Sequence, residues 1–101
     1  MGKELTFAGI LKDAREKKSL LLRQVAAMIN ADTALISKFE KNERKPTKEQ
    51  VIKLAKVLEI EEERLFTLFL SERLIQELRT EVYAAQALKM AQKKIKELHK
   101  K

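Results

Sequence analysis

The sequence predicts an all-helical protein: five short helices, two of them joined as a tight helix-turn-helix, followed by one long helix. Three observations support this fold class. The 101 residues include only two Gly and one Pro, fewer turn residues than sheet-rich folds need. Apolar residues recur at helical spacing along most of the chain. Within residues 25–40, two helices are joined by so few residues that neither can bury its apolar face alone.

The first helix is predicted over residues 7–18. Thr6 precedes it as an N-cap, because a Thr hydroxyl can accept a hydrogen bond from the free N–H groups of the first turn. The apolar stripe of this helix consists of Phe7, Ile10, Leu11 and Ala14. This spacing places the four side chains on one face, which is expected to meet the core.

The helix-turn-helix follows, with its helices predicted over residues 21–29 and 33–41. Asn30 lies where the first of them must end, and Asn tolerates the left-handed conformation that such an end often uses. Asp32 is the expected N-cap of the second, because its carboxylate can accept from free N–H groups. The residues expected to face a common core are Val25, Ile29, Ala31, Ile36 and Phe39.

Two more helices complete the compact part of the predicted fold. A loop ends at Pro46, since the residue before Pro avoids the helical region. Thr47 and Gln50 form a capping-box pattern at the start of the fourth helix. A fifth helix is predicted from about Glu62, where acidic residues in the first turn complement the helix dipole.

The last helix is predicted to run unbroken from about Ser71 to the C-terminus, because no Gly or Pro interrupts it. Its apolar stripe consists of Leu74, Leu78, Val82, Ala85, Leu88, Ala91, Ile95 and Leu98. The spacing follows a straight helix rather than a strict heptad. Such a helix of about thirty residues would be about 40 Å long, more than the preceding helices can cover. We therefore expect residues 71–101 to form a dimer interface and residues 1–70 to form a separate domain. A solvated tail over residues 93–101 is the alternative.

The positive charge of the chain is concentrated in its first half. The formal net charge is +7; residues 1–58 carry 13 Lys and Arg against 7 Asp and Glu, and residues 59–101 carry 9 against 8. A basic region that coincides with a helix-turn-helix favours a polyanionic partner. A Lys-rich surface that only maintains solubility is the alternative.

An ordered set of residues resembles the phage-repressor and Cro type of helix-turn-helix, also called the xenobiotic-response-element family. The resemblance covers roughly residues 5–70 and rests on Arg15, Val25-Ala26, Ile36, Glu40, Pro46 and the segment 54–58. It implies a repressor-like five-helix domain. It also implies a buried ion pair between Arg15 and Glu40, which would join the first helix to the end of the recognition helix. Two unrelated surface charges are the alternative.

The resemblance implies that residues 33–41 form the recognition helix, which lies in the DNA major groove. The residues implied to touch base edges are Thr33, Ala34, Ser37 and Lys38. Lys38 can donate to guanine, while Ala34 and the methyl group of Thr33 can pack against a thymine methyl. The residues expected to contact phosphates lie at the edges of the hairpin and are Arg23, Gln24, Lys41, Asn42, Arg44 and Lys45.

Three positions depart from the family pattern. Leu21 stands where the family usually has a Ser or Thr cap, and Leu22 where it usually has a phosphate-binding Gln. The apolar run over residues 20–22 therefore indicates extra packing or a patch for another protein. Asn42 replaces the usual Gly, a mild change at a left-handed position.

The sequence offers no residues for catalysis, a cofactor or a metal site. It contains no Cys and a single His, His99, which lies among lysines. It has no glycine-rich phosphate-binding loop. No apolar run approaches the length of a membrane span, and charges are spread through residues 1–20, unlike a secretion signal. A cytoplasmic protein is expected.

We therefore predict a sequence-specific transcriptional regulator that binds double-stranded DNA. It would act as a homodimer on a near-palindromic operator, as phage repressors and restriction–modification controllers do. No small-molecule effector is expected. The alternative is a protein-interaction module, such as an antitoxin or adaptor, that uses its C-terminal helix to bind another protein.

Overall fold

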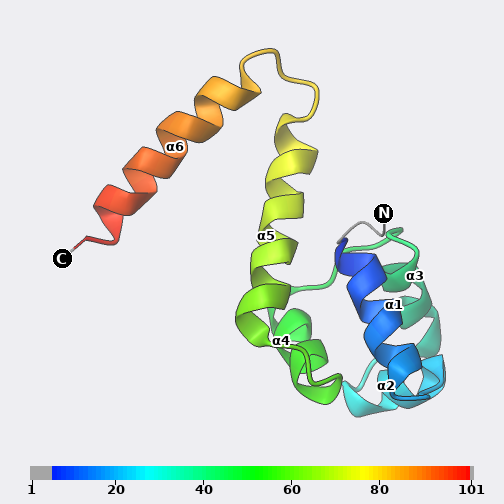
Figure 1. The fold of residues 1–101 in the computed structure, drawn as a ribbon. Helices are drawn as coiled ribbons and strands as arrows, with labels where there is room; N and C mark the ends of the chain where they lie inside the picture. Colours follow the sequence, from blue (N-terminus) through cyan, green and yellow to red (C-terminus); the bar gives the residue numbers. More distant parts are fainter. Residues whose placement is uncertain (1–5, 101) are drawn as a thin grey trace.

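The computed structural model describes residues 6–100, and within this range the chain forms six helices and no strand. They are α1 (Phe7–Lys17), α2 (Leu22–Met28), α3 (Thr33–Glu40), α4 (Lys48–Val57), α5 (Glu62–Leu78) and α6 (Ala84–Leu98). The predicted all-helical fold class is confirmed. Figure 1 shows α1 to α4 gathered around the first half of α5, while α6 stands apart. Residues 1–5 and 101, which the predicted division into 1–70 and 71–101 includes, lie outside the described residues.

The first four helices are separated from their successors by the same kind of turn. Each connection contains one residue with a positive φ: Ser19 at 56°, Asn30 at 58°, Asn42 at 60° and Glu59 at 57°. In each case the next residue donates its N–H to the carbonyl five positions back, as Ala31 does to Ala26 at 2.8 Å. This Schellman arrangement ends a helix and reverses the chain within a few residues. The predicted left-handed end at Asn30 is confirmed.

The core lies where α1 to α5 meet. Its fully buried side chains include Leu11 of α1, Val25 of α2, Phe39 of α3, Leu54 of α4 and Leu65 of α5, each exposed by 1% or less. Every helix of the domain thus contributes at least one side chain to a single core. The apolar run at residues 20–22 is divided, because its outer two residues pack against the core and the middle one is half exposed.

The prediction of one unbroken helix from Ser71 onward is wrong. α5 continues through that position to Leu78, a turn occupies residues 79–83, and α6 begins at Ala84. The turn contains Thr80, Val82 and Tyr83, whose β-branched or aromatic side chains lose rotamer freedom in a helix. Val82 and Tyr83 are 84% and 72% exposed, so tertiary packing does not offset these weak propensities. Val82 therefore lies in a turn and not on a helical stripe.

α6 extends away from the rest of the chain. It has no buried residue, and Figure 1 shows it descending from the end of α5 on the side away from α1 and α3. The Cα radius of gyration is 15.6 Å, whereas a compact chain of this length has about 13 Å. The apolar side chains of α6 and of the end of α5 therefore have no cover within the described chain.

Candidate nucleic-acid interface

The helix-turn-helix presents the whole outer face of α3. Asp32 caps the helix, accepting a hydrogen bond from the Leu35 N–H at 3.2 Å. Ile36 and Phe39 anchor the inner face in the core, each 1% exposed. α3 has eight residues and is about 12 Å long. The diameter of a helix with its side chains, about 10–12 Å, fits the roughly 12 Å width of the major groove.

The residues implied to touch base edges lie together on the outer face of α3. Thr33, Ala34 and Lys38 are exposed, and Ser37 between them is half-buried. Their spacing of one, three and one residues keeps them within one side of the helix. This surface offers one ammonium group, two hydroxyl groups and small methyl groups. Such groups can donate to guanine and contact thymine methyls, but they lack the two-pronged amide and guanidinium contacts that discriminate strongly.

Arg15 and Glu40 form an ion pair behind α3. The Arg15 Nε atom lies 2.7 Å from Oε2 of Glu40, and Nη2 lies 3.0 Å from Oε1. Nη1 of Arg15 also donates to the Leu20 carbonyl at 2.8 Å. The two side chains are only 13% and 8% exposed. The pair thus connects α1 to the C-terminal end of α3 and to the start of the helix-turn-helix.

The same contacts keep Arg15 charged. The hydrogen bond to Glu40 raises the pKa of the guanidinium, and the negative charges of Glu40 and Glu16 raise it further, while burial opposes them. A raised pKa stabilises the fold at every pH below the ordinary pKa of Arg, and that contribution is lost only in strong alkali. The ion pair therefore persists throughout the physiological range.

The start of α2 is capped in an unusual way. Leu21 occupies the N-cap position and has no side-chain acceptor. Instead, the Leu21 N–H donates to the Gln24 side-chain oxygen at 2.7 Å. This bond orients the Gln24 side chain and leaves its amide N–H groups available for an external acceptor such as a phosphate. Arg23, beside it in the first turn of α2, is also exposed.

The loop after α3 carries the remaining predicted phosphate contacts. Lys41, Asn42, Arg44 and Lys45 are all exposed. Lys45, however, contacts the Asn42 side-chain oxygen at 3.0 Å and Glu72 at 3.5 Å. Arg44 takes part in none of the ion pairs found among residues 6–100. Of these two cations, Arg44 is therefore the more available to a polyanion.

Glu72 makes two contacts that the sequence did not predict. Its carboxylate accepts the Phe7 N–H, the first of α1, at 2.7 Å and also contacts Lys45. Its side chain is 19% exposed. Glu72 thereby connects α5 to the start of α1 and to the loop after α3. Its spacing from Leu65 and Phe69, seven and three residues, places it on the core face of α5. This position could have indicated that Glu72 contacts the rest of the domain. The sequence instead assigned Glu72 to the long C-terminal helix predicted to begin at Ser71.

Comparison with known proteins identifies the family. A helix-turn-helix family model matches residues 11–65, more than half of the chain, and the match spans the later part of α1, the helix-turn-helix, α4 and the start of α5.

The chain belongs to the Cro/C1-type helix-turn-helix family. It is accordingly a DNA-binding protein of the transcription-regulator class. No curated protein and no solved structure matches the chain significantly.

Two further properties of the described residues bear on this helix-turn-helix protein. Within residues 6–100, no group of three or more His, Asp or Glu side chains is placed to hold a metal ion. None of the helices in this range combines the length and the apolar character that crossing a bilayer requires.

Proposed function

We propose that this helix-turn-helix protein regulates transcription as a homodimer that places the α3 helices of its two subunits in successive major grooves of a near-palindromic operator. The observation that carries the proposal is the outer face of α3, where Thr33, Ala34, Ser37 and Lys38 lie together above a helix held from behind by the core. These residues would contact base edges. Arg23, Gln24, Lys41, Asn42 and Arg44 would contact phosphates, and Lys45 would do so after leaving Glu72.

The exposed surface of the chain supports a dimer. The accessible surface is 7765 Å², whereas a compact monomer of 11.7 kDa would expose about 5,900 Å². Two chains that buried this excess would remove about 3,700 Å², which lies within the roughly 2,000–5,000 Å² of obligate homodimers. The apolar residues available for such an interface are Leu74, Leu78, Leu88, Ala91, Ile95 and Leu98. Ala84 joins them in place of the predicted Ala85, because Ala84 lies four residues before Leu88 and so shares its face of α6.

A two-fold dimer would constrain the operator. Each α3 would occupy one major groove on the same side of the duplex, so the two half-sites would lie about 34–36 Å apart, one helical turn of DNA. The two half-sites would be related by the same two-fold axis as the subunits. Because the base-contacting surface of α3 is small, the spacing and shape of the DNA would supply part of the specificity.

The direct test is the salt dependence of binding to a fluorescent duplex, followed by anisotropy. The double variant Arg44→Ala with Lys45→Ala should weaken binding to all duplexes. It should also flatten the slope of log affinity against log salt by about 0.9 for each phosphate that the protein no longer binds. Arg44→Ala alone should account for more of this change than Lys45→Ala alone, because Lys45 is partly neutralised by Glu72.

The matched control is Lys53→Ala with Lys56→Ala, which removes the same charge from the exposed side of α4. This control should leave the slope close to that of the wild type. Equal slopes for both double variants would contradict the assignment of the loop after α3 to the DNA interface. If the protein is instead an adaptor or antitoxin-like module, it should be monomeric and show no preference among duplexes.

A further inference from the structure

The open face of α5 and the apolar face of α6 have complementary spacing. On α5, one row of residues that are exposed or half-buried consists of Arg64, Thr67, Ser71, Leu74 and Leu78, at intervals of 3, 4, 3 and 4. On α6, the apolar face consists of Ala84, Leu88, Ala91, Ile95 and Leu98, at intervals of 4, 3, 4 and 3. Two helices laid antiparallel would bring these residues opposite one another in order, with apolar pairs at the end of α5, where Leu74 meets Leu88 and Leu78 meets Ala84.

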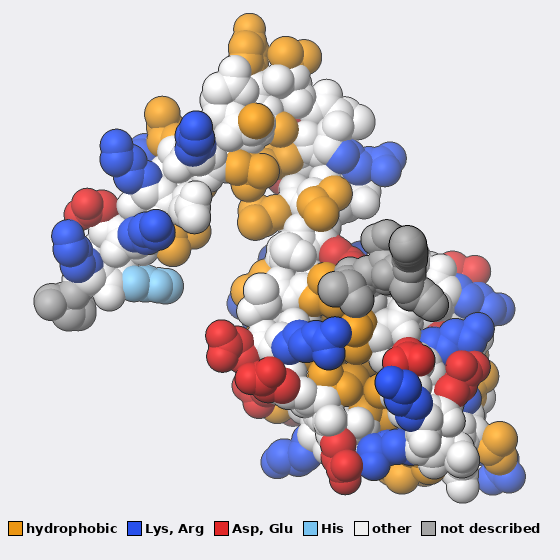
Figure 2. Space-filling model, in the orientation of Figure 1, with side chains coloured by type: hydrophobic (Ala, Val, Ile, Leu, Met, Phe, Trp, Pro, Cys, Tyr) orange, Lys and Arg blue, Asp and Glu red, His pale blue; other side chains and the backbone are white. Residues whose placement is uncertain are grey.

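The two helices also match in length. α5 has 17 residues and α6 has 15, which correspond to about 26 and 23 Å. In the antiparallel pairing, Leu88 meets Leu74 and the small residues Ser71 and Ala91 face each other at the centre. Small residues at the centre of a helix pair allow the backbones to approach closely. Figure 2 shows hydrophobic side chains collected along the inner side of the angle between α5 and α6.

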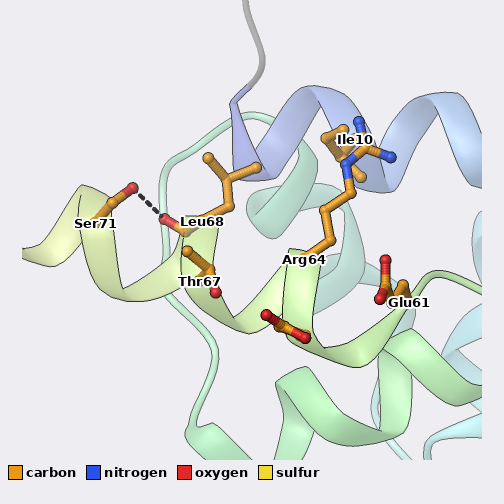
Figure 3. A pocket seen from close by; sticks show the side chains of 7 residues that line it. Ile10, Glu61, Arg64, Thr67, Leu68 and Ser71 are labelled. Atoms are coloured by element: carbon orange, nitrogen blue, oxygen red, sulfur yellow. Dashed lines mark hydrogen bonds between the residues drawn. The ribbon is translucent and has the colours of Figure 1, made fainter.

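A groove between α1 and α5 extends this surface toward the start of α5. It has a volume of about 440 Å³, and its lining includes Ile10, Arg64, Leu68 and Ser71. Figure 3 shows the Arg64 side chain reaching across from α5 toward Ile10 of α1, with Leu68 beside them. In the antiparallel pairing the last turn of an α6 helix, which ends with the 74%-exposed Leu98, would lie at this groove.

Charge favours the same orientation. Three exposed acidic residues, Glu61, Glu62 and Glu63, lie at the start of α5, and none of them takes part in the ion pairs found among residues 6–100. The end of α6 carries the lysines at positions 93, 94, 96 and 100 against one acidic residue, Glu97. An antiparallel pair places the basic end of α6 beside the acidic start of α5, whereas a parallel pair would separate them.

The turn at residues 79–83 directs α6 away from its own α5. Each of the four earlier connections reverses the chain through a residue with positive φ, but no non-Gly residue within 79–83 has one, and this segment contains no Gly. Arg79 keeps a helical conformation, with φ −60° and ψ −24°. The two helices consequently diverge (Figure 1). α6 therefore does not cover the open face of its own α5.

We propose that two copies exchange their α6 helices, so that α6 of each subunit lies antiparallel along the open face of α5 of the other and ends in the groove between α1 and α5. This proposal rests on the proposed homodimer and specifies its geometry. Exchange of an identical element between protomers produces a closed two-fold dimer. The arrangement buries the apolar face of both helices at once and places both α3 helices in a fixed relation.

The test uses disulfide cross-linking, because the chain contains no Cys of its own. Two single variants, Ser71→Cys and Ala91→Cys, are mixed, allowed to exchange subunits, and oxidised. A bond between them can form only between chains, and it requires a Cα separation of about 4.4–6.8 Å. We expect about half of an equimolar mixture to run as a covalent dimer on non-reducing gels, because random exchange places one variant of each kind in half of the dimers. A second pair, Thr67→Cys with Ile95→Cys, should give the same result.

The matched control is Lys93→Cys mixed with Ser71→Cys, since position 93 lies on the opposite side of α6; it should give only background cross-linking. Each single variant oxidised alone should do the same. The exchange is overturned if light scattering shows a dimer but neither pair cross-links, or if Ser71→Cys cross-links to itself. It is also overturned if a single chain that carries both Ser71→Cys and Ala91→Cys forms the disulfide within one monomer. A wild-type protein that is monomeric by light scattering would refute the homodimer as well.

Discussion

The ion pair between Arg15 and Glu40 predicts strong energetic coupling. Replacing Arg15 with Met leaves the Glu40 carboxylate, 8% exposed, without the two donors that lie 2.7 and 3.0 Å away. Leaving one member of a buried pair uncompensated costs about 3 kcal/mol. We therefore expect Arg15→Met and Glu40→Leu each to lower the free energy of unfolding by about 3 kcal/mol. For a domain of this size, that loss lowers Tm by roughly 12–24 °C.

Combining the two substitutions shows whether their effects on stability are coupled or independent. Arg15→Met with Glu40→Leu removes both charges and leaves only the Leu20 carbonyl without its donor, a loss of about 1–2 kcal/mol. It should therefore be more stable than either single variant, whereas independent effects would sum to about 6 kcal/mol.

The assay is urea denaturation followed by circular dichroism at one fixed protein concentration, because dimerisation contributes to apparent stability. The matched control is Lys17→Met, which breaks the exposed pair between Lys17 and Asp13 at 3.4 Å and should change stability by about 0.5 kcal/mol or less. If the double variant lost as much stability as the two single variants together, or if each single variant resembled the control, Arg15 and Glu40 would not act as a pair.

Three further predictions concern α3 and α6. Lys38→Ala should relax base preference at one position in each half-site by about 1–3 kcal/mol, measured by competition among duplexes; unaltered specificity would remove Lys38 from the base-contacting set. Asp32→Ala should lower Tm by roughly 4–8 °C, because it removes a cap worth about 1 kcal/mol, whereas Asp32→Asn should keep the cap and the Tm. Truncation after Leu78 should convert a dimer into a monomer by light scattering and lower operator affinity. Equal mass and affinity in the truncated protein would show that α6 is not needed for pairing.

The sequence was sufficient to predict the compact part of the fold, because the helix caps and turn residues there indicate the same helices as the spacing of the core residues. Thr6, Asp32 and Thr47 each supply an N-cap to the helix that follows. Asn30 adopts the left-handed conformation, and Phe39 is buried where the helical period places it.

The C-terminal end could not be predicted in the same way, because α5 has no buried residue after Phe69 and α6 has none at all. Gly and Pro are the residues that most strongly interrupt a helix, and residues 79–83 contain neither. The break arises instead from several residues of low helix propensity, because no packing contact compensates for that low propensity. The contacts of Glu72 were not predicted for a related reason. Glu72 lies on the core face of α5, but α5 was predicted to end before residue 71, whereas it continues to Leu78.

The most direct test of DNA reading by α3 is selection of bound sequences from a pool of random duplexes by the purified full chain. We predict enrichment of two inverted half-sites whose centres lie about 10–10.5 base pairs apart, with Lys38→Ala weakening the base preference at one position in each. A pool that remains random after repeated rounds at low salt would contradict the placement of α3 against base edges.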